Sequence, residues 1–197
     1  MSHVAHQAEM TAEEFLAWEA AQLNERHEFV DGRVIPKNGS EARHNIVNLN
    51  VAIALRQHLS GTPCLVLPIA MQLGVANDRH FFYPDVLVTC SEADRQSRLI
   101  KREPTLIVEV LSPSTAAYDL GAKFAHYRQI PTLREIAFID LDERRTSVYR
   151  KNADGLWVLH PFDAGADVRF ASVDLTITAT ALFADVDETA PPAQTSN

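Results

Sequence analysis

The feature that most constrains this chain is an apolar run that carries a single acid, Leu106-Ile107-Val108-Glu109-Val110-Leu111. A run of this length and composition predicts a buried β-strand. An ionised carboxylate is costly to bury alone, so Glu109 requires a cation, a metal ion or a proton as compensation. The sequence therefore predicts a site at this strand. The ordinary alternative is an edge strand on which water or an arginine satisfies the carboxylate.

Two other charged residues are suited to a site beside Glu109: Asp85, in Tyr83-Pro84-Asp85-Val86, and Lys123. Two carboxylates at the ends of neighbouring strands can bind one Mg²⁺ or Mn²⁺, because these hard ions prefer oxygen ligands. Such an ion can activate a water and neutralise charge on a phosphodiester, while an ammonium orients the water or holds the phosphate. We therefore predict Asp85 and Glu109 as metal ligands and Asp85, Glu109 and Lys123 as catalytic residues.

Whether Lys123 can reach Glu109 depends on the predicted helix Asp119–Ile130, which Pro131 would end. The apolar stripe of this helix consists of Leu120, Phe124 and Tyr127. Lys123 borders the stripe, which places its ammonium near the sheet instead of in open solvent. The alternative is a surface lysine paired with Asp119 at i, i+4.

Several motifs together resemble a known family. They are Glu28-Phe29-Val30-Asp31-Gly32, His44, Tyr83-Pro84-Asp85, the run from Val108 to Thr115, Asp119, Lys123, Tyr127, the run from Glu135 to Asp140, and Val148-Tyr149-Arg150. In these motifs the chain resembles the Uma-type family of proposed restriction endonucleases, within the PD-(D/E)xK nuclease superfamily. The resemblance covers most of the chain. It implies a restriction-endonuclease-like fold and Mg²⁺- or Mn²⁺-dependent hydrolysis of DNA.

Four further residues are predicted to support the site: Glu28, His44, Gln72 and Tyr127. The resemblance implies an additional acid at Glu28 and a phosphate-binding group at His44, while Gln72 could flank the site from a neighbouring strand. Three of these residues also have an ordinary interpretation. Glu28 could be a simple hairpin residue, His44 a polar residue on the first turn of a helix, and Tyr127 a core residue.

Two positions depart from the pattern of the family. The superfamily usually has a lysine two residues after the second acid, whereas this chain has Leu111. The role of the catalytic lysine is then assigned to Lys123. Ile136-Ala137 stand where an aromatic pair is common, which concerns packing or partner choice more than catalysis.

The order of predicted elements gives an α/β fold with a mixed central β-sheet flanked by helices. A capping box at Thr11 and Glu14 begins a helix with Phe15, Leu16, Trp18, Ala20 and Leu23 on its buried face. A second helix runs from about Glu41 to Gly61, with Ile46, Leu49, Ile53 and Leu55 as its apolar positions. Predicted strands cover His27–Val30, Arg33–Pro36, Cys64–Leu67, Ala70–Gly74, His80–Thr89, Thr105–Leu111, Glu135–Leu141, Arg145–Tyr149, Leu156–His160 and Val173–Ile177, before a helical turn at Thr180–Val186.

We expect one domain over residues 10–186 with flexible termini at 1–9 and 187–197. The N-terminal segment lacks a signal-peptide pattern and the apolar stretches are too short to span a bilayer, which favours a cytoplasmic protein without membrane contact. Cys64 and Cys90 have no zinc-site spacing and are expected to be buried thiols. The segment from Ser91 to Glu103 is expected to be a polar connecting loop.

The net charge of −8 argues against a broad electrostatic grip on nucleic acid. A local basic loop with Arg95, Arg98, Lys101 and Arg102 reduces the force of that objection. Two alternatives to a DNA endonuclease stay open: a non-catalytic protein- or nucleic-acid-binding module with the same fold, and a hydrolase of small phosphoesters. A serine hydrolase is disfavoured because no Gly-x-Ser-x-Gly elbow is present. A homodimer is expected, because cutting both strands of a duplex often needs two active sites.

Overall fold

The computed structural model describes residues 10–37, 41–68, 71–113 and 115–187. Its strands are β1 (Arg26–Val30), β2 (Arg33–Lys37), β3 (Leu65–Pro68), β4 (Gln72–Val75), β5 (His80–Phe82), β6 (Val86–Thr89), β7 (Ile100–Lys101), β8 (Pro104–Leu111), β9 (Glu135–Asp140), β10 (Arg145–Lys151), β11 (Trp157–Phe162), β12 (Val168–Phe170) and β13 (Leu175–Ile177). Its helices are α1 (Ala12–Ala20), α2 (Ala42–His58), α3 (Glu92–Gln96), α4 (Ala116–Tyr118), η1 (Asp119–Lys123), α5 (Phe124–Tyr127), η2 (Ala171–Val173) and α6 (Ala179–Leu182).

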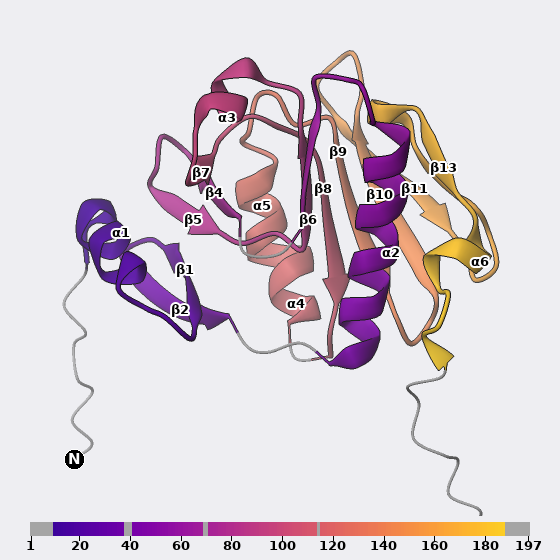
Figure 1. Ribbon diagram of the computed structural model, residues 1–197, viewed down its shortest axis with the longest axis horizontal. Coiled ribbons are helices and arrows are strands. Elements are labelled where there is room, and N and C mark those ends of the chain that lie inside the picture. The colour runs from indigo at the N-terminus through magenta and orange to yellow at the C-terminus, as the bar shows by residue number, and fades with distance from the viewer. Residues whose placement is uncertain (1–9, 38–40, 69–70, 114, 188–197) are drawn as a thin grey trace, which may run out of the picture.

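The central element is a six-stranded mixed sheet with the order β11-β10-β9-β8-β6-β3, in which β8 and β9 are parallel. Successive side chains of a strand point to opposite faces, so Leu106, Val108 and Val110 pack into the core that includes α2. Ile107 and Leu111 belong to the core on the other face, where Tyr127 and residues of β4 and β5 pack. Glu109 alternates with Val108 and Val110 and therefore projects to the face of Ile107 and Leu111, on which Tyr127 packs. Figure 1 shows α4 and α5 beside β8, on the side away from α2.

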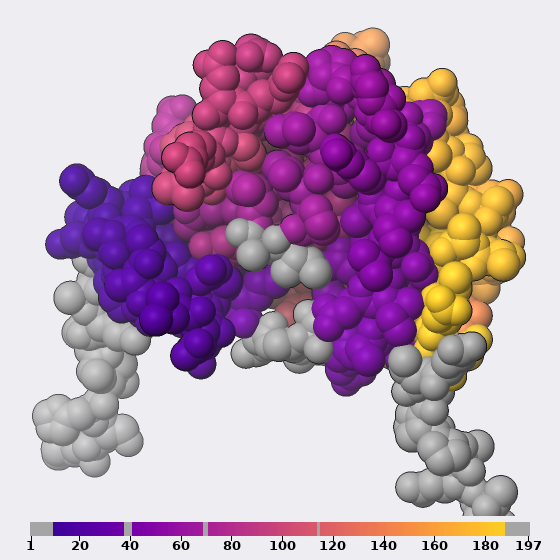
Figure 2. All heavy atoms as spheres, viewed as in Figure 1, coloured from indigo at the N-terminus to yellow at the C-terminus, as the bar shows by residue number. Residues whose placement is uncertain are grey.

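A second sheet, with the order β2-β1-β5-β4-β7, carries the N-terminal hairpin. The predicted Asp31-Gly32 turn is confirmed, with φ values of 49° and 78°, the left-handed values that such a two-residue turn requires. The predicted capping box of α1 is also present. Phe15, Phe29 and Phe81 form a small core between α1 and this sheet. Figure 2 shows α1 and the hairpin standing out at one side of the body.

The prediction of one strand over His80–Thr89 is wrong, because the segment forms two strands in different sheets. The break falls at Tyr83-Pro84-Asp85. Proline supplies no N–H to a ladder and restricts the residue before it, so Pro84 disfavours continuous pairing through this point. Consequently Asp85 lies where the chain crosses from the five-stranded sheet to the six-stranded one.

The predicted helix Asp119–Ile130 is displaced: helical structure begins at Ala116, ends at Tyr127 and contains the π-helical segment η1. Thr115 at the N-cap makes no side-chain capping hydrogen bond. The wider η1 turn buries both Asp119 and Lys123. The prediction that Lys123 avoids open solvent is confirmed.

The two cysteines are not buried thiols: Cys64 and Cys90 form a disulfide with Cα atoms 4.0 Å apart, and both are partly exposed. The pairing follows from the register of β3 with β6, in which Leu65 lies opposite Thr89. The next residue outward on each strand is therefore a cysteine, and these two face each other.

Some residues predicted to lie on buried helix faces are exposed in the structure. Leu49 and Ile53 are exposed on α2, whose buried apolar stripe is Val47, Val51, Ala52 and Leu55. Leu23 is exposed because α1 ends before it. The segment from Ser91 to Glu103 is not a simple loop but contains α3 and β7, and Lys101 is buried within it.

The sequence-predicted flexible terminus 1–9 and residues 188–197 of the other terminus lie outside the described residues. Among the helices of the described residues, none has both the length and the apolar character needed to cross a membrane.

Candidate functional site

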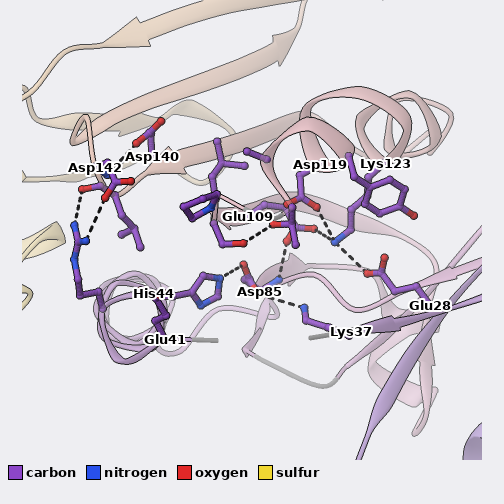
Figure 3. A pocket seen from close by; sticks show the side chains of 18 of the residues that line it. Glu28, Lys37, Glu41, His44, Asp85, Glu109, Asp119, Lys123, Asp140 and Asp142 are labelled. Carbon is purple, nitrogen blue, oxygen red and sulfur yellow. Dashed lines mark hydrogen bonds and ion pairs between the residues drawn. The ribbon is translucent and has the colours of Figure 1, made fainter. Parts of the chain in front are cut away.

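A pocket of about 590 Å³ opens between the β1–β2 hairpin, the start of α2 and the helical segment that follows β8 (Figure 3). The acidic side chains lining it are Glu28, Glu41, Asp85, Glu109, Asp119, Asp140 and Asp142. The permanently charged basic side chains lining it are Lys37, Arg43 and Lys123. Because the acids outnumber these bases, the pocket is electrostatically suited to a metal cation and unfavourable to a free polyanion.

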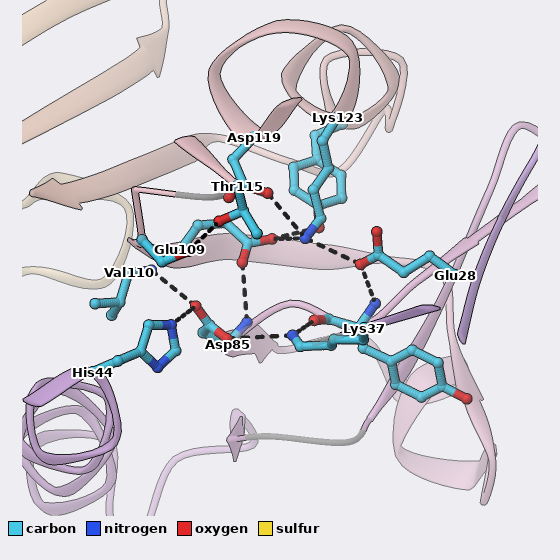
Figure 4. Close-up of polar contacts among 12 residues, drawn as sticks. Glu28, Lys37, His44, Asp85, Glu109, Val110, Thr115, Asp119 and Lys123 are labelled. Atoms are coloured by element: carbon cyan, nitrogen blue, oxygen red, sulfur yellow. Dashed lines mark hydrogen bonds and ion pairs between the residues drawn. The ribbon is translucent and has the colours of Figure 1, made fainter. Parts of the chain in front are cut away.

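Asp85 lies immediately before β6 and is buried, with 5% of its surface exposed. Its Oδ2 accepts a hydrogen bond of 2.9 Å from the backbone N–H of Val110 and lies 3.0 Å from Nε2 of His44. Its Oδ1 lies 3.3 Å from Nζ of Lys37. The carboxylate is therefore fixed by one backbone group and two basic side chains (Figure 4).

Glu109 extends from β8, the neighbouring strand, and is 2% exposed. Its Oε2 accepts a hydrogen bond of 3.3 Å from the backbone N–H of Asp85. Its Oε1 accepts a 2.6 Å hydrogen bond from the hydroxyl of Tyr127 and lies 3.0 Å from Nζ of Lys123. Reciprocal contacts between Asp85 and β8 thus hold the two carboxylates beside each other.

Lys123 is as buried as the acids it contacts, with 4% of its surface exposed. Its Nζ lies 3.0 Å from Oε1 of Glu109, 3.1 Å from Oε1 of Glu28 and 3.4 Å from Oδ1 of Asp119. The ammonium thus pairs with Asp119 at i, i+4 and also contacts Glu109 on β8 and Glu28 on β1. The sequence offered the contact with Glu109 and the pairing with Asp119 as alternatives, and the structure contains both.

The two central carboxyls differ in acidity. Burial alone would raise the pKa of Asp85, but the hydrogen bond with His44 and the charge of Lys37 hold it well below its ordinary value. Burial raises the pKa of Glu109 to about 7 despite the nearby charge of Lys123. Asp85 is therefore a permanent anion near neutral pH, whereas Glu109 can exchange a proton or be held ionised by an added cation.

Of the predicted supporting residues, the structure brings three to this cluster. Glu28 contacts Lys123 and also accepts a 3.2 Å hydrogen bond from the backbone N–H of Tyr83. His44 contacts Asp85, and its Nδ1 is buried without a hydrogen-bond partner among the described residues. Tyr127 is both a core residue and a hydrogen-bond donor to Glu109.

Gln72 is not brought to this cluster. It lies on β4, beside β7 in the five-stranded sheet, and it is not among the described residues that line the pocket. Its side chain is buried instead in that sheet. The expectation that Gln72 flanks Asp85 and Glu109 therefore has no support in the geometry.

Lys37 contributes to the cluster but was not predicted from the sequence. Besides its contact with Asp85, its Nζ donates a hydrogen bond to the carbonyl oxygen of Tyr83. A signal existed in the hairpin, because Glu28 pairs with Ile35 and Lys37 is two residues further along the same strand. Directly paired residues and residues two apart share one face of a sheet, so Glu28 places Lys37 on the face of the site.

Comparison with known proteins gives three kinds of match. The sequence model of the Uma2 family, described as "Putative restriction endonuclease", matches residues 12–180. The uncharacterized protein slr1290 of Synechocystis sp. is 32% identical over 174 residues, covering 88% of this chain and 91% of that protein. The uncharacterized protein sll1609 of the same organism is 36% identical over 152 residues, covering 76% and 85%.

A crystal structure from Anabaena variabilis, described as that of "a putative nuclease belonging to DUF820", has a TM-score of 0.74 to this chain. The two chains are 18% identical, and the match covers 88% of this chain and 97% of the other. At this identity the likeness concerns the fold, and it confirms the predicted α/β architecture with mixed sheets flanked by helices.

Proposed function

The chain belongs to the Uma2 family, and from this premise we propose that it is a divalent-metal-dependent endonuclease that hydrolyses DNA phosphodiester bonds. The observation that carries the proposal is the convergence of Asp85, Glu109 and Lys123 in one pocket from two neighbouring strands and a helix. The description of the Anabaena variabilis protein as a putative nuclease adds support for the reaction class.

The residues present fit a hard divalent cation. Asp85 and Glu109 offer carboxylate oxygens side by side, in a pocket whose acids outnumber its lysines and arginines. Oxygen ligands suit Mg²⁺ and Mn²⁺. We therefore propose that Asp85 and Glu109 hold the ion. When bound, it would lower the pKa of a water molecule and neutralise charge developing on the phosphodiester.

The protein's own groups would prepare this chemistry. Asp85 is fixed as an anion, and Tyr127 holds one oxygen of Glu109 in place. The ammonium of Lys123 would stabilise charge on the scissile phosphate or orient the attacking water, because a fixed charge in a buried site needs little reorganisation. Glu28 and Asp119 position this ammonium through their ion pairs.

Leu111 stands two residues after Glu109, where a lysine is usual, but the site still contains a basic group. Nζ of Lys123 lies 3.0 Å from Oε1 of Glu109, so the helix can supply the charge that other nucleases of this superfamily take from the strand. Leu111 belongs to the same core as Ile107 and also lines the pocket. We propose Lys123 as the catalytic lysine on this ground.

Cleavage assays with matched variants test the proposal. The purified chain is incubated with supercoiled plasmid, single-stranded DNA and bis-p-nitrophenyl phosphate in Mg²⁺ and in Mn²⁺. Glu109→Gln should lower the cleavage rate by about 10²-fold or more, and Lys123→Ala by a similar factor. Glu135→Gln is the matched control, since Glu135 is equally buried but pairs with Arg150 on the next strand.

The outcomes are distinct. Plasmid cleavage that Glu109→Gln and Lys123→Ala lower by this factor and Glu135→Gln retains supports the endonuclease, provided thermal melting shows that all three variants are folded at the assay temperature. Cleavage confined to bis-p-nitrophenyl phosphate supports the hydrolase of small phosphoesters. No activity of the wild type on any substrate with either ion supports the non-catalytic module.

We also propose that the active form is a homodimer, because one site per protomer would address each strand of a duplex. Multi-angle light scattering at micromolar concentration, with and without DNA, measures the mass directly. A monomer in both conditions removes this proposal without affecting the chemistry at Glu109.

A further inference from the structure

A second group of metal-ligating side chains lies outside the pocket. Asp31 is in the β1–β2 turn, His80 begins β5, and His126 is on α5. One oxygen or nitrogen atom from each residue lies within 4.8 Å of the other two. None of the three residues lines the pocket that contains Glu109.

The two imidazoles are held close together by the fold. The centroids of the His80 and His126 rings are 4.2 Å apart. His80 is 5% exposed, so its ring is fixed by the surrounding structure. Nδ1 of His126 is buried and has no hydrogen-bond partner among the described residues. A buried ring nitrogen without a partner is costly, and a metal ion bound by both rings would satisfy it.

Asp31 supplies the third ligand and the negative charge. Its Oδ1 lies 3.8 Å from Nδ1 of His80, and its backbone N–H donates a hydrogen bond of 3.4 Å to the same nitrogen. Nδ1 of His80 thus carries no proton, and a metal ion bound there would replace this long hydrogen bond. Since Asp31 lies at an exposed turn, a small rotation of its side chain can bring the carboxylate closer to both rings.

We propose that Asp31, His80 and His126 form a transition-metal site that takes Zn²⁺, with water completing the coordination shell. Two imidazoles and one carboxylate suit Zn²⁺, whereas Mg²⁺ prefers oxygen ligands throughout. The site is therefore chemically distinct from the carboxylate pair in the pocket, and it does not depend on the proposed nuclease activity.

The position of this site gives it a structural consequence. Each proposed ligand lies three residues from a residue in or beside the pocket cluster: Asp31 from Glu28, His126 from Lys123, and His80 from Tyr83. The backbone of Tyr83 contacts Glu28 and Lys37. A metal ion there would fasten the hairpin, β5 and α5 to one another. It would thereby hold together the elements that form the Glu28–Lys123 ion pair.

Zinc binding to untagged, chelator-treated protein tests the site. Isothermal titration should give one equivalent of tight Zn²⁺ binding that raises the melting temperature. His126→Gln and Asp31→Asn should each weaken this binding by about 10-fold or more, a loss at least as large as that from removing a supporting residue of a metal site. These two variants alter partly exposed or exposed side chains, so they should fold.

His160→Gln, on strand β11, is the matched control and should bind Zn²⁺ like the wild type. Glu109→Gln should also retain this equivalent, which separates the site from the pocket. Co²⁺ substitution should give a visible d–d absorption that His126→Gln loses. The proposal is wrong if the wild type binds no Zn²⁺ at 100 μM, or if His126→Gln and Asp31→Asn bind it as tightly as His160→Gln.

Discussion

Replacing Lys123 by methionine should destabilise the protein strongly in metal-free buffer. Three buried carboxylates, Glu28, Glu109 and Asp119, lie within 3.4 Å of its ammonium nitrogen. Methionine fills a similar volume without charge, so these acids would lose their shared cation. Removing one partner of a buried ion pair typically costs about 3–5 kcal/mol. For a chain of this size, that corresponds to a fall in melting temperature of roughly 6–20 °C.

A double-mutant cycle separates the ion pair from general loss of packing. The free energy of unfolding is measured by urea titration with EDTA for Lys123→Met, Glu109→Gln and the double variant. Because Glu109→Gln removes one of the stranded charges, the double variant should lose less stability than the two single losses added together. The coupling energy should be on the order of 1–3 kcal/mol.

The matched control replaces another buried lysine. Lys101 is also 4% exposed, but its ammonium donates to the backbone carbonyl oxygens of Asp94 and Ser97 instead of pairing with the pocket acids. Lys101→Met combined with Glu109→Gln should therefore be additive within about 0.5 kcal/mol. A coupling energy below that value in the Lys123 cycle would refute the view that Glu109 depends on this ammonium for compensation.

Three further predictions concern the disulfide, the first helix and pH. The Cys64–Cys90 bond joins residues 26 apart, so replacing both by serine should lower the unfolding free energy by about 3 kcal/mol in urea titrations, and unchanged stability would contradict a formed disulfide. Thr11→Ala should cost about 1 kcal/mol in thermal melting by removing the N-cap of α1, whereas Thr11→Ser should cost little. Burial raises the pKa of Glu109 from 4.5 to about 7, so between these values the folded chain keeps a proton that the unfolded chain releases. With EDTA present, the stability of the wild type relative to Glu109→Gln should therefore fall as pH rises through this window; a difference that stays constant across the window would mean that the folded chain does not raise this pKa.

The centre of the site could be predicted because its signals are local. A carboxylate within a run of Val, Ile and Leu is costly in any fold that buries the run, and this identified Glu109. Lys123 followed from helical periodicity, since it borders an apolar stripe. The Asp31-Gly32 turn followed from the left-handed backbone that such a hairpin requires.

The remaining errors concern features that short sequence patterns do not determine. The spacing of Cys64 and Cys90 along the chain carries no information about their contact, which depends on β3 lying beside β6. The periodicity of the helix before Tyr127 does not reveal the π-helical turn that buries Asp119 and Lys123 together. Likewise, the hairpin pairing places Lys37 on the face of Glu28, but its contact with Asp85 depends on how the hairpin lies against β6, which local sequence does not determine.

The most direct test of metal binding by Asp85 and Glu109 is the anomalous scattering of Mn²⁺ in crystals soaked at millimolar concentration. We expect a peak bound by the carboxylates of Asp85 and Glu109, and loss of that peak in Glu109→Gln crystals. A wild-type crystal without a peak at these carboxylates, in which both keep only their contacts to His44, Lys37, Lys123, Tyr127 and the backbone, would contradict the assignment of a metal-dependent site.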